Sequence, residues 1–307
     1  MRILLLGKNG QVGWELQRSL APLGEVIALD RAETHPIYGE LSGDLSNLDA
    51  LAATVRAVRP DVIVNAAAHT AVDRAESEPD LARTLNALAP GVLADEAQKL
   101  GAWLVHYSTD YVFDGSGDQP WRETDAPAPL SVYGRTKLEG EQRIQASGAK
   151  HLIFRTSWVY GARGGNFAKT MLRLAQERDR LTVIDDQFGA PTGAELLADI
   201  TAQVTAQAIS RMNQTASETL QGIYHLAAGG ETTWNGYARH VVAEALRLKP
   251  DLSIKAQEIA AVPTSAFPTP AVRPHNSRLD TQKLQSAFGL VLPPWQQGVN
   301  RMLAETV

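Results

Sequence analysis

The 307-residue sequence contains no cysteine, which excludes a disulfide framework, a thiol nucleophile and a zinc site with cysteine ligands. It also lacks any run of about 18 consecutive apolar residues, so no membrane-spanning helix is expected. The apolar run at residues 3–6 ends at Gly7 and is too short for a secretory signal. We therefore expect a protein of the reducing cytoplasm.

A large excess of one charge is missing as well. The 29 Lys and Arg residues against 34 Asp and Glu residues give a net charge of −5. Without a basic field we expect no nucleic-acid partner and no membrane partner, and an anionic ligand must be held by local groups. The length and the 44% of apolar residues are typical of one large globular domain or two.

Short apolar runs alternate with amphipathic stretches through the first half of the chain. Continuous apolar runs, typical of strands buried on both faces, occupy residues 3–6, 26–29, 62–64, 103–105 and 152–154. Helical patterns occupy residues 47–58, 90–100, 133–146 and 194–209. This alternation predicts an α/β fold with a Rossmann-type, doubly wound parallel sheet.

The alternation becomes less regular after about residue 155, and four prolines between residues 262 and 274 exclude a regular helix there. We expect two domains with the following boundaries. The dinucleotide-binding domain takes residues 1–155 plus about 190–228, and a smaller, irregular α/β substrate domain takes about 156–189 plus 229–307.

Three glycines follow the first predicted strand. Gly7, Gly10 and Gly13 form G-x-x-G-x-x-G at the start of a helical pattern. Glycines let a backbone approach a ligand closely, and a helix N-terminus offers free N–H groups to phosphate. The pattern predicts a dinucleotide pyrophosphate site, with an ordinary tight strand–helix turn as the alternative.

Asp30 closes the second predicted strand, 17 residues after Gly13. An acid at this point suits a hydrogen bond to the ribose 2′-hydroxyl of adenosine, which favours NAD. Arg31 follows at once and Lys8 is nearby in sequence, and either cation would attract the 2′-phosphate of NADP. The sequence leaves the choice between NADH and NADPH open.

Tyr133 and Lys137 are four residues apart, which places them on one face of a helix. A tyrosine at its ordinary pKa is a poor acid at neutral pH, and a neighbouring ammonium lowers that pKa. Ser108 and Thr109 follow a predicted strand, where a hydroxyl would polarise a carbonyl bound in the crevice. Together these residues predict a site for carbonyl reduction, with a surface tyrosine–lysine pair as the alternative.

The chain resembles the extended short-chain dehydrogenase/reductase family, which acts mainly on nucleotide sugars. The resemblance is carried by residues 7–13, 64–73, 108–113, 133–137, 155–160, 273–274 and 276–279. It implies reduction of the C4 keto group of a dTDP-sugar by NADPH or NADH. A related epimerase or dehydratase, or a non-catalytic subunit on the same fold, is the alternative. Tyr111 stands where a dehydratase has a second acid, and the intact Thr109, Tyr133 and Lys137 disfavour the non-catalytic subunit.

The resemblance also implies a role for residues at matching positions. The catalytic residues would be Thr109, Tyr133 and Lys137. The cofactor would contact Gly7, Gly10, Gln11, Val12, Gly13, Asp30, Asp44, Leu45, Ala68, His69, Thr70, Tyr133 and Lys137. The substrate would contact Thr109, Asp110, Tyr133, Trp158, Asn166 and Arg273.

Two features depart from the family pattern. Residues 31–43 are long for the family, which affects the adenosine side of the site. Glu15 and Glu195 match positions at which some members hold Mg²⁺ between two subunits, but Gln297 replaces the expected third carboxylate. Since Mg²⁺ prefers carboxylate oxygen, we expect a metal-bridged homodimer to be weak or absent.

Overall fold

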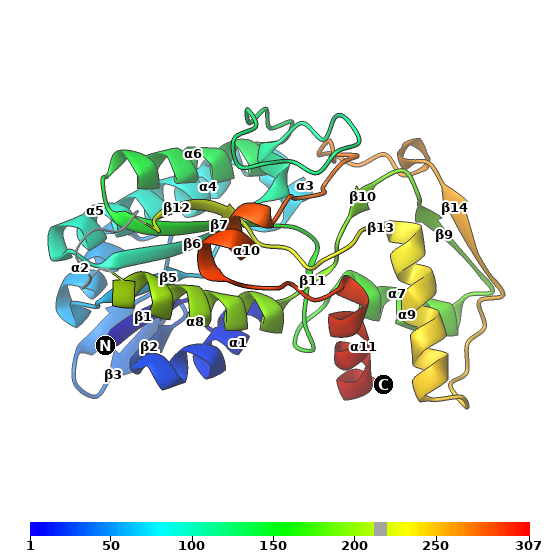
Figure 1. The fold of residues 1–307 in the computed structure, drawn as a ribbon, viewed down its shortest axis with the longest axis horizontal. Coiled ribbons are helices and arrows are strands. Elements are labelled where there is room, and N and C mark those ends of the chain that lie inside the picture. Colours follow the sequence, from blue (N-terminus) through cyan, green and yellow to red (C-terminus); the bar gives the residue numbers. More distant parts are fainter. Residues whose placement is uncertain (212–219) are drawn as a thin grey trace.

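Within residues 1–211 and 220–307, which the computed structural model describes, six parallel strands form the central sheet (Figure 1). They are β1 (Arg2–Leu6), β2 (Glu25–Leu29), β5 (Val62–Asn65), β6 (Trp103–Thr109), β7 (Lys150–Thr156) and β12 (Gly222–His225). Their order is β12-β7-β6-β5-β1-β2, and all neighbours are parallel. The predicted Rossmann-type α/β fold is confirmed.

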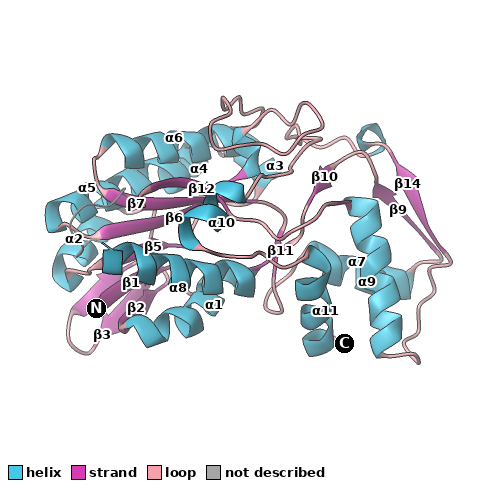
Figure 2. Cartoon of the chain, in the orientation of Figure 1, coloured by secondary structure: helices cyan, strands magenta, loops and turns pink. Residues whose placement is uncertain are grey.

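The strands are continuously apolar because helices cover both faces of the sheet (Figure 2). Ile3 and Leu5 of β1 pack toward α1 (Gln11–Leu20) and α8 (Ala194–Arg211). Leu4 and Leu6 pack on the opposite face. That face is covered by α2 (Leu48–Val58), α5 (Ala89–Leu100) and α6 (Val132–Ala146). The shorter helices α3 (Val72–Ser77) and α4 (Pro79–Arg83) and the π-helical turn Thr84–Leu88 precede α5.

The strand order reverses at β1, because the chain first adds β2 on one side and then β5 on the other. At such a reversal the loops after the two strands diverge, and a ligand crevice opens at their carboxyl ends. The long segment at residues 31–43 forms an antiparallel hairpin of β3 (Ala32–His35) and β4 (Gly39–Ser42), separate from the central sheet. After the hairpin the chain continues into α2. This is the part of the site where the sequence predicts the adenosine of the cofactor.

A second lobe is built mainly from later segments (Figure 1). It contains α7 (Phe167–Glu177), α9 (Trp234–Leu248), α11 (Trp295–Thr306) and the parallel pair β9 (Arg180–Ile184) and β14 (Glu258–Val262). Short pairs join β8 (Val159–Tyr160) to β11 (Thr192–Gly193) and β10 (Phe188–Gly189) to β13 (Thr232–Thr233). Within the described residues no helix has the length and hydropathy needed to cross a bilayer.

The lobe has its own apolar clusters, one around Tyr237 and Trp295 and one around Leu181 and Val242. Helix α10 (Gln282–Phe288) packs instead with the core of the central sheet, through Leu284 and Phe288. The predicted division into residues 1–155 plus 190–228 and 156–189 plus 229–307 assigns α10 to the substrate domain. The division as a whole stays a prediction.

A buried ion pair fixes α6 to β7. Arg155 Nε donates to Glu141 Oε1 at 2.9 Å, and Arg155 Nη2 donates to Glu141 Oε2 at 2.6 Å. The two side chains are only 3% and 1% exposed. The Phe113 ring lies 5.1 Å from the guanidinium carbon. Because α6 carries Tyr133 and Lys137, this pair holds the predicted catalytic helix in place.

We predict that Glu141→Ala lowers the free energy of unfolding by about 3–5 kcal/mol, because Arg155 is left charged and unpaired in the core. The matched control is Glu177→Ala, which breaks the exposed Arg173–Glu177 pair on α7. That change should cost less than about 1 kcal/mol. Urea unfolding of both variants measures the difference. Equal losses would show that the buried pair does not stabilise the fold beyond a surface pair.

Candidate active site

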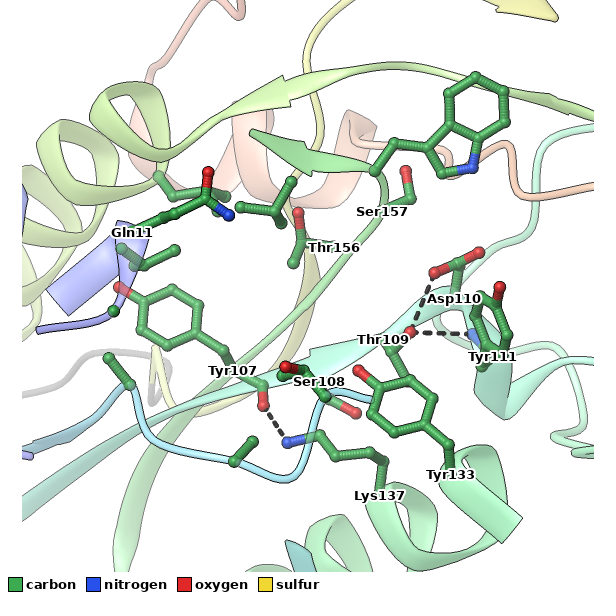
Figure 3. A pocket seen from close by; sticks show the side chains of 18 of the residues that line it. Gln11, Tyr107, Ser108, Thr109, Asp110, Tyr111, Tyr133, Lys137, Thr156 and Ser157 are labelled. Atoms are coloured by element: carbon green, nitrogen blue, oxygen red, sulfur yellow. Dashed lines mark hydrogen bonds between the residues drawn. The ribbon is translucent and has the colours of Figure 1, made fainter. Parts of the chain in front are cut away.

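A cavity of about 580 Å³ opens at the carboxyl ends of the central strands (Figure 3). Its wall is made by the loops after β1, β5, β6 and β7, by α6 and by residues of the second lobe. The structure places many of the predicted site residues on this wall. They are Gly7, Gly10, Gln11, Val12, Ala68, Thr70, Thr109, Asp110, Tyr133, Lys137, Trp158 and Arg273.

The glycine loop brings the start of α1 to one end of the cavity. Gly7 has a φ of +85°, and a Cβ there would lie 2.8 Å from the Ala67 nitrogen. A Cβ on Gly13 would lie 2.0 Å from the Gly7 oxygen, so Gly13 allows the helix to start against the loop. Gly10 precedes α1 as its N-cap and offers no side-chain cap, which leaves N–H groups of the first turn available to an anion.

The loop after β5 passes the cavity with small side chains, Ala66, Ala67 and Ala68. His69 is not among the residues that line the cavity, and its Nε2 lies 3.5 Å from Glu78 Oε2. The buried Asn86 fixes this turn, since its Oδ1 accepts from His69 N at 2.8 Å and its Nδ2 donates to His69 O at 3.1 Å.

Tyr133 and Thr109 meet at the end of β6. The Ser131 hydroxyl caps α6 by accepting from Gly134 N at 3.1 Å, which places Tyr133 in the first turn. The Thr109 side chain lies beside the Tyr133 hydroxyl, and its Oγ1 donates to Asp110 Oδ1 at 2.9 Å. The Tyr111 ring packs edge-on against the Tyr133 ring at 5.5 Å. Figure 3 shows the Tyr133 hydroxyl directed at the strand end that carries Ser108 and Thr109.

Burial raises the pKa of Tyr133, and the neighbouring Thr109 side chain offsets only part of that rise. The expected lowering of this pKa by a lysine ammonium is wrong for this structure. Lys137 Nζ donates to the Tyr107 carbonyl oxygen at 2.5 Å and lies 3.1 Å from His106 Nε2 (Figure 3). The ammonium is thus directed at β6, and the sequence spacing gave no sign of this acceptor.

The buried groups around Lys137 are shifted toward their neutral forms. Burial lowers the pKa of Lys137 to about 8, although Glu141 acts in the opposite direction. Burial and the charge of Lys137 hold the pKa of His106 well below its ordinary value. His106 is therefore uncharged at neutral pH, and Lys137 is the cation at this end of the cavity.

On the side toward the second lobe, the cavity wall carries a carboxyl group, a guanidinium cation and aromatic rings. Burial raises the pKa of Asp110 to about 6, against hydrogen bonds from Ser277 and Thr109. Arg273 Nη2 donates to Asp73 Oδ2 at 2.6 Å. Trp158 has a φ of +49°, a strained conformation for a large residue.

The Trp158 ring stacks on the Trp234 ring with the ring centroids 3.7 Å apart, and both rings line the cavity. The stacked pair therefore gives this side of the cavity a broad apolar wall.

Several predicted residues lie off the cavity wall: Gly13, Asp30, Asp44, Leu45, His69 and Asn166. Asp30 and Asp44 belong to the turns after β2 and β4, where Asp30 accepts from Asn9 Nδ2 at 2.6 Å and Asp44 from Ser46 N at 2.9 Å. Asn166 caps α7 by accepting from Lys169 N at 3.1 Å, and its Nδ2 donates to Gly161 O at 2.7 Å. Their contacts with a ligand stay predictions.

Other cavity residues were missed: Val72, Tyr107, Tyr111, Thr156, Ser157, Val159, Leu197 and Trp234. Thr156 and Ser157 follow β7, so the strand-end argument that found Thr109 applies to them too. Trp234 carries no local signal, because it reaches the cavity from the start of α9 in the other lobe.

Buried polar atoms on the wall lack partners within the described part of the chain. They are Gln11 Oε1, Ser108 Oγ, Asp110 Oδ2, Thr156 Oγ1 and Ser157 Oγ. Buried polar groups in native proteins are nearly always hydrogen-bonded, so unpaired ones in a cavity indicate a polar ligand. Together with the free N–H groups of α1, they fit a dinucleotide cofactor that enters along the glycine loop.

Glu15 and Glu195 line a separate small pocket, which Arg301 and Glu305 share. Burial raises the pKa of Glu195. Among residues 1–211 and 220–307, no group of three or more His, Asp or Glu side chains is arranged to hold a metal ion. In this pocket Arg301 Nε lies 3.3 Å from Glu305 Oε1.

Comparisons with known proteins agree with the geometry. The chain is 60% identical over 305 residues to a Shigella flexneri protein named dTDP-4-dehydrorhamnose reductase, covering 99% of this chain and 98% of that protein. A structure of dTDP-4-dehydrorhamnose reductase from Bacillus anthracis in complex with NADP is similar, with a TM-score of 0.83, 34% identity and 99% of each chain covered.

A UDP-glucose 4-epimerase from Thermus thermophilus, in complex with NAD, shares the fold at 20% identity and a TM-score of 0.74, over 100% of this chain and 99% of that one. The family described as RmlD substrate binding domain matches residues 1–307. The resemblance predicted from the motifs is confirmed: from its glycine loop to its C-terminal helix, the chain belongs to the RmlD substrate binding domain family.

Proposed function

We propose that this chain reduces the C4 keto group of dTDP-4-dehydro-β-L-rhamnose with NADPH or NADH and releases dTDP-L-rhamnose. This is the last step of dTDP-rhamnose synthesis, which supplies cell-surface polysaccharide. The observation that carries the proposal is the Tyr133 hydroxyl held beside Thr109 in a cavity that begins at the glycine loop. The name of the Shigella relative, at 60% identity, supports the substrate.

The reduced nicotinamide supplies the hydride when it is bound. The N–H groups at the start of α1 and the Gln11 side chain would hold its pyrophosphate, with Val12 beside them. Ala68 and Thr70 would line its path toward Lys137. Asp30, Asp44 and Leu45 would lie on its adenosine side, and the His69 backbone along its length.

Tyr133 donates the proton that the reduced carbonyl needs. Because burial keeps the phenol protonated, its proton is available as negative charge develops on the C4 oxygen. The Thr109 hydroxyl is close enough to the phenol to share the same oxygen as a hydrogen-bond partner. The phenolate that remains regains a proton from solvent. Lys137, whose ammonium donates to the Tyr107 carbonyl oxygen, would hold the nicotinamide ribose.

The substrate would be held on the side of the second lobe. Asp110 would accept hydrogen bonds from sugar hydroxyls, and the stacked Trp158 and Trp234 offer an apolar wall to the sugar ring. The Arg273 guanidinium suits the diphosphate. Asn166, already engaged in capping α7, is the remaining predicted contact.

The function is tested by incubating the chain with dTDP-4-dehydro-L-rhamnose and each reduced cofactor, with product analysis. Stoichiometric oxidation of NADH or NADPH and formation of dTDP-L-rhamnose are expected. A related epimerase or dehydratase would recycle its cofactor, so product formation without net oxidation would favour that alternative. Binding of cofactor and substrate without any product would favour the non-catalytic subunit.

We predict that Tyr133→Phe lowers kcat by about 10²–10⁴-fold, because the variant keeps the ring but loses the proton donor. The Kd for NADH should stay within about twofold of the unmodified chain, since the change leaves the glycine loop intact. Tyr38→Phe, on the turn of the β3–β4 hairpin, is the matched control and should retain full turnover. Steady-state kinetics and cofactor titration give both quantities, and near-normal turnover of Tyr133→Phe would remove it from the chemistry.

We also predict that kcat/KM falls above about pH 8, where Lys137 loses its proton. A lysine is charged below its pKa, so a lowered pKa means that the charge is lost at a lower pH than in an exposed lysine. The neutral His106 supplies no other cation there. Lys137→Met should weaken NADH binding and abolish the alkaline decline of its residual activity. A wild-type profile that stays flat to pH 10 would show that the charge is not needed.

The remaining predictions concern partners and location. We infer that the dTDP-sugar is the partner, that any homodimer is weak, and that a metal-bridged homodimer is weak or absent. Cytoplasmic location stays a prediction from the sequence.

A further inference from the structure

The β3–β4 hairpin brings a carboxylate against the glycine loop. Glu33 of β3 forms an ion pair with Lys8, with the Lys8 Nζ to Glu33 Oε2 distance at 2.5 Å. Its other oxygen, Oε1, accepts from Asp30 N at 3.0 Å. The side chains of Lys8 and Glu33 are 26% and 31% exposed. A single side chain thus connects the loop after β1 with the end of β2.

Glu33 is ionised in this position. Partial burial acts to raise its pKa, but the hydrogen bonds from Lys8 and from the Asp30 backbone outweigh this and lower the pKa. Asp30 is itself held by Asn9, which donates to Asp30 Oδ2 at 2.6 Å. The end of β2 therefore presents two carboxylates, Asp30 and Glu33, and Lys8 is already paired with one of them.

In doubly wound folds the ribose of a bound adenosine lies at the end of β2, where Asp30 and Glu33 are placed here. NADH has a hydroxyl at the 2′ position of this ribose, whereas NADPH has a phosphate with nearly two negative charges. From the sequence alone the choice between NADH and NADPH stays open, because either Lys8 or Arg31 could attract that phosphate. The hairpin reduces this ambiguity, since Glu33 neutralises Lys8 and adds a second negative charge beside Asp30.

We propose that Glu33 sets the preference of this chain between NADH and NADPH by disfavouring the 2′-phosphate. The inference rests on the proposed function, because it assumes that the chain binds a nicotinamide dinucleotide along the glycine loop. Removing the charge of Glu33 frees the Lys8 ammonium for the phosphate and removes one source of repulsion. The 2′-hydroxyl of NADH carries no charge and gains little from either change.

The experiment is a titration of NADH and NADPH against the full chain without sugar substrate, by calorimetry. Glu33→Gln should lower the Kd for NADPH about tenfold and leave the Kd for NADH within about twofold. The matched control is Glu40→Gln on the same hairpin, whose carboxylate accepts from the exposed Thr34 hydroxyl instead of from the glycine loop. That control should change neither constant.

A second pair of variants identifies the cation. Lys8→Ala alone should change NADPH affinity little, because Glu33 already occupies the ammonium. In the Glu33→Gln background, Lys8→Ala should remove most of the tenfold gain. An equal gain with and without Lys8 would overturn the part assigned to the ion pair.

The outcomes separate this inference from the proposed function. If both cofactors bind and Glu33→Gln alters their affinities equally, or no more than Glu40→Gln does, Glu33 does not select the cofactor and the reductase proposal stands. If neither cofactor binds the unmodified chain, both proposals fail. Circular dichroism of each variant shows whether a lost affinity reflects a lost fold.

Discussion

The close approach of α6 to the end of β6 is the constraint on which the arrangement of the site depends. A Cβ on Gly134 would lie 2.2 Å from the Tyr111 carbonyl oxygen, and one on Gly140 would lie 2.2 Å from the Asn86 oxygen. Only glycine permits the helix to lie this near the strand end and the turn before α5. Because of this approach, the preceding Tyr133 reaches Thr109, and Lys137 reaches the backbone of β6.

The same approach removes water from the titratable groups at the strand end, and the electrostatics follow from burial. Tyr133 and Asp110 have raised pKa values, and Lys137 has a lowered one, so each group is shifted toward its neutral form. For a reductase this favours a protonated phenol before hydride transfer, since the proton must leave only when negative charge appears on the substrate.

Much of the fold and part of the site could be predicted because their signals are local. The apolar run at residues 3–6 indicated a strand buried on both faces, and the glycine spacing after it indicated the phosphate loop; the sheet and the cavity agree with both. Trp234 could not be found, because its place beside Trp158 depends on how two distant segments pack. The direction of the Lys137 ammonium was missed for a similar reason, as helix spacing names neighbours on one face but not an acceptor on a facing strand.

The two ends of the crevice differ in how freely their residues can change. At the catalytic end, Lys137 is buried on α6, Thr109 is buried on a central strand and Tyr133 lies in the first turn of α6, so their substitution disturbs packing beside a paired sheet. At the adenosine end, β3 and β4 pair only with each other among the strands described, and Glu33 is partly exposed. Substitutions in the hairpin can therefore alter the charge near the ribose without shifting the register of the central sheet. The fold thus separates the choice of cofactor from the chemistry that the cofactor supports.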